Sequence, residues 1–356
     1  MAKSITDARK ILVRAPNWLG DAILALPALG EVRSRFPEAE IAVLARASVA
    51  ELFRSVPGVN RVVVFDHRVR HAGVFGLLRL AGELRRERFD LAVLFQNAFQ
   101  AALIAFLAGI PRRLGYRRDA RGPLLTHGIR LPRRGEIPPH ETYYYQDLLR
   151  RAGWFEGLTM VEHIRLEPPP AAREEMRARL QELGLERGAN NRPLVVLAPG
   201  AAYGSAKCWL PERFAELADR LVERRNAAVL LCGTSAEAGL GEAIASRMRA
   251  RSVSFIGQTT LEEFLGLLAN VDLFIGNDSG AMHLAAGLGL PQVIVFGPTD
   301  EAGTGPLNVR ARLVKEPVSC SPCFLRHCPV DHRCMTRVAV DAVWQEVEAA
   351  LGAPAQ

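Results

Sequence analysis

Short runs of apolar, mostly β-branched residues alternate along the first half of the chain with longer segments of helical periodicity. The apolar runs are residues 10–15, 40–44, 61–65 and 90–95, and the helical segments are about residues 21–36, 49–55 and 75–86. Such alternation is typical of β-strand, α-helix, β-strand units, in which helices cover a parallel sheet. The first half therefore predicts one doubly wound α/β domain.

The same alternation resumes after a proline cluster at residues 166–171, LEPPPA, which neither a helix nor a central strand tolerates. Thr260 and Glu263 form the sequence pattern of a capping box at a helix start. The expected strands are residues 194–198, 228–232, 253–256, 271–275 and 292–296, and helices are expected at about 171–185 and 340–351. The second half therefore predicts a second doubly wound domain.

The proline cluster sets the predicted domain boundaries. We expect an N-terminal domain over residues 1–167, a C-terminal domain over 168–339, and a terminal helix within 340–356, with packing back on the N-terminal domain as one alternative for that helix. Open α/β sheets bind ligands at the carboxyl ends of their strands. We therefore expect the ligand in a cleft between the carboxyl ends of the two sheets.

Composition agrees with a globular protein of two domains. The 356 residues are 49% apolar and 23% charged, which leaves ample material for two cores. No segment approaches the roughly 18–20 uninterrupted apolar residues of a membrane-spanning helix. Charged residues stand where a signal peptide has its apolar region, so we expect a cytoplasmic location.

The net charge of +7 favours anionic molecules as partners. Arginine far outnumbers lysine, and its planar guanidinium suits carboxylates and phosphates. A nucleic-acid-binding protein is the alternative from another class. However, aromatic residues make up only 7% of the chain and no recognised nucleic-acid-binding module is present.

Two loops in the second half have the composition of anion sites. Residues 199–211, PGAAYGSAKCWLP, follow a predicted buried strand; small residues let backbone N–H groups approach an anion, and Lys207 adds a charge. Residues 276–283, GNDSGAMH, follow another such strand, and Asp278 or Ser279 is placed to cap the next helix. A solvated loop lysine and an ordinary capped helix with a packed His283 are the plainer alternatives.

An acidic residue follows the first strand of the chain. In Asn17-Trp18-Leu19-Gly20-Asp21, Gly20 permits a tight turn and Asp21 lies at a helix N-terminus. There its carboxylate either complements the helix dipole or removes a proton from an incoming hydroxyl. An acid combined with two anion-binding loops suits transfer of a sugar from a diphosphate, and no DxD metal motif is evident.

Four segments make the chain resemble glycosyltransferase family 9 over nearly its whole length. They are RAPNWLGDAILALPAL at 14–29, PGAAYGSAKCWLPERFAELA at 199–218, GNDSGAMHLAAGLGLPQVIVFGPTD at 276–300 and CSPCFLRHCPVDHRCM at 320–335. The resemblance implies a GT-B fold and an inverting, metal-independent transfer that needs no cofactor. The implied donor is ADP-L-glycero-D-manno-heptose and the implied acceptor is the first heptose on the Kdo-lipid A core of lipopolysaccharide.

The resemblance also implies roles for individual residues. Asp21 matches the proposed general base, and Lys207, Gly204 and Ser205 match a diphosphate clamp. The implied donor-binding residues are completed by Glu237 at the ribose, Thr259 and Thr260 at the adenine, and Asp278, Ser279, Gly280 and His283 at the sugar and phosphates. One departure is that Ala201 and Ala202 replace hydroxyl-bearing residues of some relatives, so Ser205 and backbone amides would have to make those contacts.

Arginines in the first half are candidates for contact with the acceptor. An acceptor carrying Kdo carboxylates and phosphates lies in the cytoplasmic leaflet of the inner membrane, so we expect peripheral contact with that surface as well. The expected acceptor-binding residues are Asn17, Arg68, Arg70, Arg112, Arg113, Arg117, Arg118 and Arg121. A solvated arginine-rich loop is the alternative interpretation.

Four of the six cysteines, Cys320, Cys323, Cys328 and Cys334, lie within fifteen residues. Their C-x2-C-x4-C-x5-C spacing can bind zinc, but it is irregular for known zinc ribbons or knuckles. Reduced structural thiols are therefore preferred to a metal site.

Two other enzyme classes use similar domains. A dinucleotide-dependent dehydrogenase needs G-x-G-x-x-G after its first strand, where this chain has NWLGD. A sugar-nucleotide epimerase shares the two-domain architecture, and would differ in releasing its nucleotide without an acceptor. Other heptosyltransferases of family 9, acting on a different position of the core, are the nearest alternatives.

Overall fold

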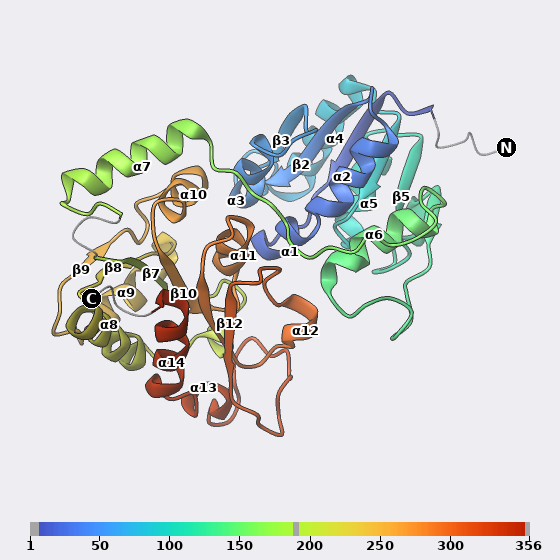
Figure 1. Cartoon of the computed structure of the whole chain (residues 1–356). Helices are drawn as coiled ribbons and strands as arrows, with labels where there is room; N and C mark the ends of the chain where they lie inside the picture. The colour runs from blue at the N-terminus through green and yellow to red at the C-terminus, as the bar shows by residue number, and fades with distance from the viewer. Residues whose placement is uncertain (1–6, 188–191, 353–356) are drawn as a thin grey trace. The chain divides into compact units, whose positions relative to one another are not determined.

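The computed structural model describes residues 7–187 and 192–352. It contains two compact units, Met1–Val161 and Glu162–Gln356. Each unit has a parallel six-stranded sheet with helices packed beside it. In Figure 1 the first unit runs from blue to green and the second from green to red. The boundary precedes the predicted one by six residues, because Leu166 already belongs to the second unit: its backbone N–H donates to the carbonyl of Gly287 at 2.9 Å.

The first unit has the strand order β3-β2-β1-β4-β5-β6, and all of its pairs are parallel. Its strands are β1 (Lys10–Arg14), β2 (Glu40–Arg46), β3 (Arg61–Phe65), β4 (Leu91–Leu94), β5 (Arg112–Tyr116) and β6 (His127–Ile129). Its helices are α1 (Leu19–Leu24), α2 (Leu26–Arg35), α3 (Ala47–Ala50), η2 (Glu51–Arg54), α4 (Gly73–Glu87), α5 (Phe99–Leu107), η3 (Gly122–Leu124) and α6 (Glu141–Arg151).

The second unit repeats this topology. Its order, β9-β8-β7-β10-β11-β12, becomes the order of the first unit when β7 is counted as strand one. The strands are β7 (Leu194–Ala198), β8 (Ala228–Leu231), β9 (Ser252–Ser254), β10 (Leu273–Asn277), β11 (Gln292–Phe296) and β12 (Ala311–Lys315). The helices are α7 (Pro170–Glu182), η5 (Ser205–Lys207), α8 (Pro211–Arg225), η6 (Ser235–Glu237), α9 (Ala238–Ala245), α10 (Leu261–Leu268), α11 (Gly280–Gly287), α12 (Glu301–Thr304), α13 (Arg333–Thr336) and α14 (Val340–Leu351).

The predicted strands of both halves are present, and three further strands were missed. β5 begins with two arginines, β6 has only three residues, and β12 is a partly exposed edge strand, so none carries a long apolar run. The helix predicted over residues 21–36 is two helices, because Pro27 lies in the first turn of α2 and the chain is redirected at Ala25. The predicted capping box is confirmed: Glu263 N donates to Thr260 Oγ1, and Thr260 N donates to Glu263 Oε2.

The C-terminal helix α14 belongs to the second unit. Its buried residues Val343, Trp344 and Val347 join the core formed by β7, β8, β10, β11 and α8. Packing back on the N-terminal domain was the alternative for this helix, and its buried apolar face lies in the core of the second unit. The apolar face of α14 covers one side of the second sheet. Arg225 of α8 also forms an ion pair with Glu348 of α14 at 3.2 Å.

Candidate functional site

The strand order of the second sheet changes direction between β7 and β10, and both predicted anion loops follow these strands. β7 leads into the loop before η5, and β10 ends at Asn277, directly before Asp278 and α11. In an open α/β sheet such a switch point leaves space beyond the carboxyl ends of the strands, where ligands bind. The fold thus brings together two segments that are about 70 residues apart in the chain.

Lys207 and Asp278 form an ion pair at this point. Lys207 Nζ lies 2.6 Å from Asp278 Oδ2, with side-chain exposures of only 12% and 4%. Thr299, in the loop after β11, donates its hydroxyl to the same carboxylate oxygen at 2.6 Å. The Lys207 ammonium also lies 5.1 Å from the centre of the Tyr203 ring, at cation–π distance. Lys207 is therefore held in place, and the plainer alternative of a solvated lysine is wrong.

Asn277 ties the two anion loops together from below. Its Oδ1 accepts from Trp209 N at 3.0 Å and its Nδ2 donates to the Pro199 carbonyl at 2.6 Å. Both Asn277 and Trp209 are fully buried, and Trp209 Nε1 donates to the Val338 carbonyl at 3.0 Å. A buried amide with both ends satisfied gives this junction a single arrangement.

The cysteine-rich segment packs directly on the Lys207 loop, a role that sequence reasoning missed. The contacts are Ser205 Oγ to His327 Nδ1 at 2.9 Å, Ala206 N to the Arg326 carbonyl at 3.0 Å, Tyr203 Oη to the Phe324 carbonyl at 2.7 Å and His332 Nε2 to the Ala206 carbonyl at 2.7 Å. A Cβ atom on Gly204 would lie 2.3 Å from the Arg326 carbonyl oxygen, so this approach requires glycine. The segment therefore supports the anion loop.

Ser279 and His283 differ from expectation in detail. Ser279 is the N-cap residue of α11 by backbone conformation, but its side chain makes no capping hydrogen bond. Its hydroxyl is buried and has no hydrogen-bond partner among the described residues, while the Asp278 carboxylate is taken up by Lys207 and Thr299. Gly280 begins the helix, and His283 is only 5% exposed within it. The expected side-chain cap of α11 is therefore absent.

Glu237 lies after β8 with its carboxylate held against the first anion loop. It forms a capping box with Thr234, whose N and Oγ1 donate to Glu237 Oε2 at 2.6 and 3.0 Å. A Cβ atom on Gly200 would lie 1.6 Å from Glu237 Oε1, so the carboxylate lies directly against the Gly200 backbone. Thr260 caps α10, with Thr259 just before it. These residues are at the β8 and β9 side of the switch point.

The first sheet places Asp21 after its own central strand. Asp21 lies in the first turn of α1, and the buried Arg14 at the end of β1 donates from Nη2 to Asn17 Oδ1 at 2.6 Å. Burial, together with the nearby Arg46, lowers the pKa of Arg14 to about 9. The loop that carries Asn17 and Asp21 is therefore fixed by the strand beneath it.

Glu141 is a second acid beside Asp21, and it was missed. Burial, and secondly the neighbouring Asp21 carboxylate, raise the pKa of Glu141 to about 7. Glu141 is the first residue of α6, 120 positions after Asp21, and no local pattern links them. Adjacent acids with such a shift are a frequent feature of sites that move protons.

The candidate acceptor arginines fall into three groups. Arg117 and Arg118 follow the carboxyl end of β5, and Arg68 and Arg70 follow that of β3; all four are on the same edge as Asp21 and are exposed. Arg112 and Arg113 begin β5, paired in register with Leu91 and Ala92, and so lie toward the opposite edge.

The expectation that Arg121 contacts the acceptor is wrong, because its side chain is fully buried. Its guanidinium donates to the Tyr116 carbonyl at 2.8 Å, to Asn97 Oδ1 at 2.8 Å and to the Gln96 carbonyl. A surface contact with an acceptor is therefore impossible for this residue, and its guanidinium joins β4, β5 and the following loop by hydrogen bonds.

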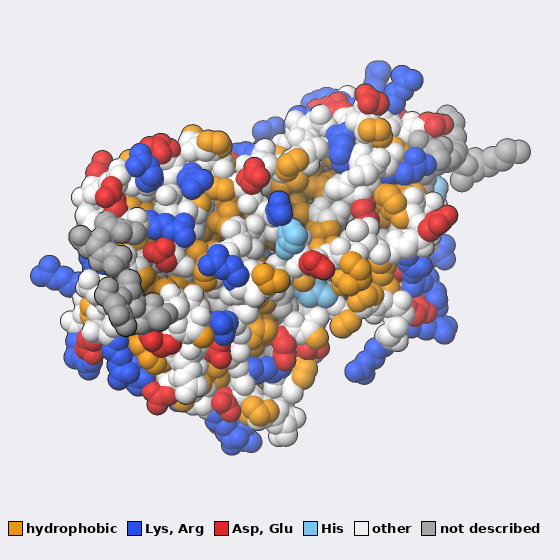
Figure 2. Space-filling view, in the orientation of Figure 1, with side chains coloured by type: hydrophobic (Ala, Val, Ile, Leu, Met, Phe, Trp, Pro, Cys, Tyr) orange, Lys and Arg blue, Asp and Glu red, His pale blue; other side chains and the backbone are white. Residues whose placement is uncertain are grey.

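Figure 2 shows basic and acidic side chains interspersed over the visible face of both units.

The cysteines are free thiols, and Cys320, Cys323 and Cys328 are exposed. Burial, and secondly the other three thiols, raise the pKa of Cys334 to about 11. Over residues 7–187 and 192–352, no group of three or more His, Cys, Asp or Glu side chains is arranged to hold a metal ion. Among the helices of these same residues, none has the length and apolar character needed to cross a membrane.

Comparisons with known proteins show the family of the chain. The family model described as glycosyltransferase family 9 (heptosyltransferase) matches residues 77–333. Lipopolysaccharide heptosyltransferase 2 of Salmonella typhimurium is 31% identical over 311 residues, which are 86% of this chain and 88% of that protein. Its counterpart from Escherichia coli is 30% identical with the same coverage.

Solved structures show the same fold. The E. coli structure titled ADP-heptose LPS heptosyltransferase II has a TM-score of 0.79 at 27% identity and covers 96% of this chain and 98% of its own. A family 9 glycosyltransferase from Veillonella parvula has a TM-score of 0.83 at 21% identity, covering 96% and 97%. The α/β fold with two doubly wound, GT-B-type domains that the sequence predicts is confirmed.

Proposed function

The chain belongs to glycosyltransferase family 9, and from this premise we propose that it transfers L-glycero-D-manno-heptose from ADP-heptose to the first heptose of the Kdo-lipid A core. The observation that carries the proposal is the buried Lys207–Asp278 pair at the switch point of the second sheet. It supplies one fixed cation beside an open helix N-terminus, which suits a diphosphate. The Salmonella and E. coli relatives are lipopolysaccharide heptosyltransferases, and the solved E. coli structure is that of an ADP-heptose heptosyltransferase, which supports this donor and acceptor.

In this proposal the second unit binds the donor. Lys207, the Ser279 hydroxyl and the backbone N–H groups at the start of α11 stabilise the charge that develops on the departing diphosphate. Glu237 accepts hydrogen bonds from the ribose, and Thr259 and Thr260 lie beside the adenine. The Ser205 hydroxyl, already bonded to His327, acts mainly through the position of the loop.

The first unit supplies the base and the acceptor surface. Asp21 removes the proton from the acceptor hydroxyl, which attacks the anomeric carbon from the face opposite ADP and inverts its configuration. Arg68, Arg70, Arg117 and Arg118, all exposed on the Asp21 edge, attract the acceptor's carboxylates and phosphates and the anionic membrane surface. Arg112 and Arg113, toward the opposite edge, are left with structural roles in β5.

Mass spectrometry of the product tests the proposal. The enzyme is incubated with ADP-heptose and Kdo-lipid A acceptors that carry no heptose, one heptose or two. We expect a mass increase of one heptose on the mono-heptosylated acceptor and little on the others. Transfer to the heptose-free or di-heptosylated acceptor instead would indicate a different family 9 specificity, and release of ADP without any acceptor would indicate a hydrolase or epimerase.

A further inference from the structure

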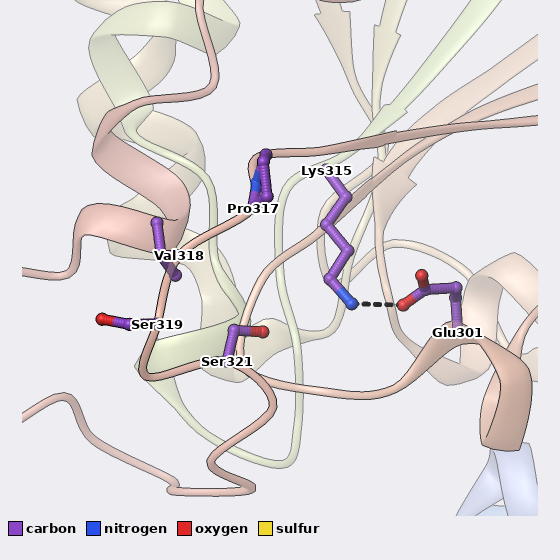
Figure 3. Close-up of a pocket in the computed structure, with 6 residues that line it drawn as sticks. All are labelled: Glu301, Lys315, Pro317, Val318, Ser319 and Ser321. Atoms are coloured by element: carbon purple, nitrogen blue, oxygen red, sulfur yellow. Dashed lines mark hydrogen bonds and ion pairs between the residues drawn. The ribbon is translucent and has the colours of Figure 1, made fainter.

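A hollow of about 540 Å³ lies in the second unit, and neither Lys207 nor Asp278 lines it. Glu301, Lys315, Pro317, Val318, Ser319 and Ser321 line it. In Figure 3 the Lys315 side chain reaches from the end of β12 toward Glu301 at the start of α12, and Ser321 lies below them on the following loop. The three segments that form this hollow carry no residue expected from the sequence to bind substrate.

The strand order locates the hollow relative to the donor. From β8 through β7, β10 and β11 to β12, the carboxyl edge presents in turn Glu237, Lys207, Asp278, Thr299 and Lys315. Because the diphosphate is proposed to lie at Lys207 and Asp278, and the ribose beside Glu237, the sugar on the other side of the diphosphate extends toward β11 and β12. That direction leads to the hollow.

Thr299 connects the hollow to the diphosphate site. Its hydroxyl donates to Asp278 Oδ2 at 2.6 Å, and its carbonyl oxygen lies 3.5 Å from Lys315 Nζ. Lys315 Nζ in turn forms an ion pair with Glu301 Oε2. A single residue therefore separates the two sites, a span that a sugar ring can bridge.

The lining selects a neutral, hydroxyl-rich ligand. The Lys315–Glu301 pair offers hydrogen-bond donors and a hydrogen-bond acceptor side by side, which suits the hydroxyl groups of a sugar. Their side chains are 24% and 40% exposed, which leaves carboxylate oxygen and ammonium N–H groups accessible to hydroxyls. Ser321 Oγ, which donates to the Gly297 carbonyl at 2.6 Å, can still accept a hydrogen bond, and Pro317 and Val318 offer apolar contact to carbon atoms.

We propose that this hollow binds the exocyclic side chain of the transferred sugar and makes the enzyme selective for a heptose over a hexose. The proposal rests on the function proposed above. A manno-heptose carries one more hydroxylated carbon outside the ring than mannose does, so its terminal hydroxyls form an adjacent pair. A carboxylate can accept from both hydroxyls of such a pair, while Lys315 donates to one of them.

Dissociation constants of the full-length enzyme for ADP-heptose, ADP-mannose and ADP, measured by calorimetry without acceptor, test the proposal. In Glu301→Gln we expect ADP-heptose to bind about tenfold more weakly, the loss of one charge-assisted hydrogen bond, while ADP-mannose and ADP change less than twofold. The matched control is Glu346→Gln, which removes the acid of the Arg312–Glu346 ion pair, 2.9 Å long and also involving a β12 residue. It should change none of the three constants.

The double variant Glu301→Gln/Lys315→Met guards against disturbance by an unpaired lysine, and the same loss of selectivity is expected from it. Equal weakening of all three ligands, or no change in ADP-heptose binding in either variant, overturns the proposal. Failure of the proposed function would look different, because the wild-type enzyme would then not transfer heptose to the mono-heptosylated acceptor.

Discussion

The carboxyl edges of the two sheets share one strand order but hold their polar groups in opposite ways. In the second unit, Lys207, Asp278 and Thr299 are joined by short hydrogen bonds and shielded from solvent. In the first unit, the acids Asp21 and Glu141 lie near each other, and burial raises the pKa of Glu141. At the edge of the second unit a carboxylate fixes the position of an ammonium group, whereas at the edge of the first unit burial and a second carboxylate raise the pKa of an acid.

In the function proposed above, one topology serves the two halves of the reaction. The Lys207 ammonium, which Asp278 holds in place, then meets the leaving diphosphate without having to reorganise. Beside the proposed base Asp21, burial and the Asp21 carboxylate raise the pKa of Glu141.

The largest effect is expected for Asp21→Asn. An amide cannot take the acceptor proton, so kcat should fall by about 10²–10⁴, while the dissociation constant of ADP remains unchanged. Steady-state kinetics and calorimetry measure the two quantities. Glu38→Gln, an exposed acid preceding β2 at the opposite edge, is the control and should retain wild-type kcat. If Asp21→Asn keeps more than about a tenth of wild-type kcat, a loss below roughly 1.4 kcal/mol, Asp21 is not the base.

Glu141→Gln tests the acidic pair through stability. The pKa of about 7 in the folded state lies above the ordinary value of 4.5, so the folded protein binds more protons than the unfolded chain between these values. The free energy of unfolding of the wild type therefore falls as the pH rises through this window, by at most about 3 kcal/mol from this group. Glutamine cannot ionise and should remove that fall.

Urea denaturation at pH 4.5 and pH 8 measures this difference. Relative to wild type, Glu141→Gln should gain stability at pH 8 and gain little at pH 4.5, whereas Glu38→Gln should follow the wild type at both. Parallel pH dependence of Glu141→Gln and wild type would show that Glu141 is ionised in the folded protein.

Lys207→Met tests the ion pair of the other edge. Loss of the charge-assisted contact should weaken ADP-heptose binding by about 10–100-fold, and the unpaired Asp278 carboxylate should destabilise the fold by about 3–5 kcal/mol. In Lys207→Met/Asp278→Asn no buried charge is left alone, so stability should recover while donor affinity stays low. Donor affinity that recovers together with stability would mean that Lys207 acts only through the fold.

The sequence predicted the features that depend on neighbouring residues, and it did not predict those that depend on contacts between distant residues. Buried central strands such as β7 and β10 have continuous apolar runs, so they and the loops after them were predicted. β5, with Arg112 and Arg113 at its start, has no such run and was missed. With β5 unrecognised, the arginines in and around it were all predicted to contact the acceptor.

The missed site residues share a different cause. Glu141, Thr299 and His327 reach the site through contacts with residues 120, 21 and 122 positions away, respectively. Local spacing contains no trace of such contacts. The tight approach of Gly204 to the cysteine-rich segment is likewise visible only in three dimensions, although a glycine in the anion loop was expected for another reason.

The smallest effect is expected from substitution of the exposed arginines. The test compares arginines at the two opposite edges of the first sheet. Arg117→Gln/Arg118→Gln should raise the acceptor KM about three- to tenfold and leave the donor KM unchanged, because each exposed charge contributes about 1 kcal/mol or less. Arg9→Gln/Arg112→Gln removes the same charge from the beginnings of β1 and β5. If attraction to the acceptor is local to the Asp21 edge, this control keeps the wild-type acceptor KM. Added salt should then raise the acceptor KM of the wild type more than the acceptor KM of Arg117→Gln/Arg118→Gln. Equal increases in both double variants would mean that only the net charge of the protein matters.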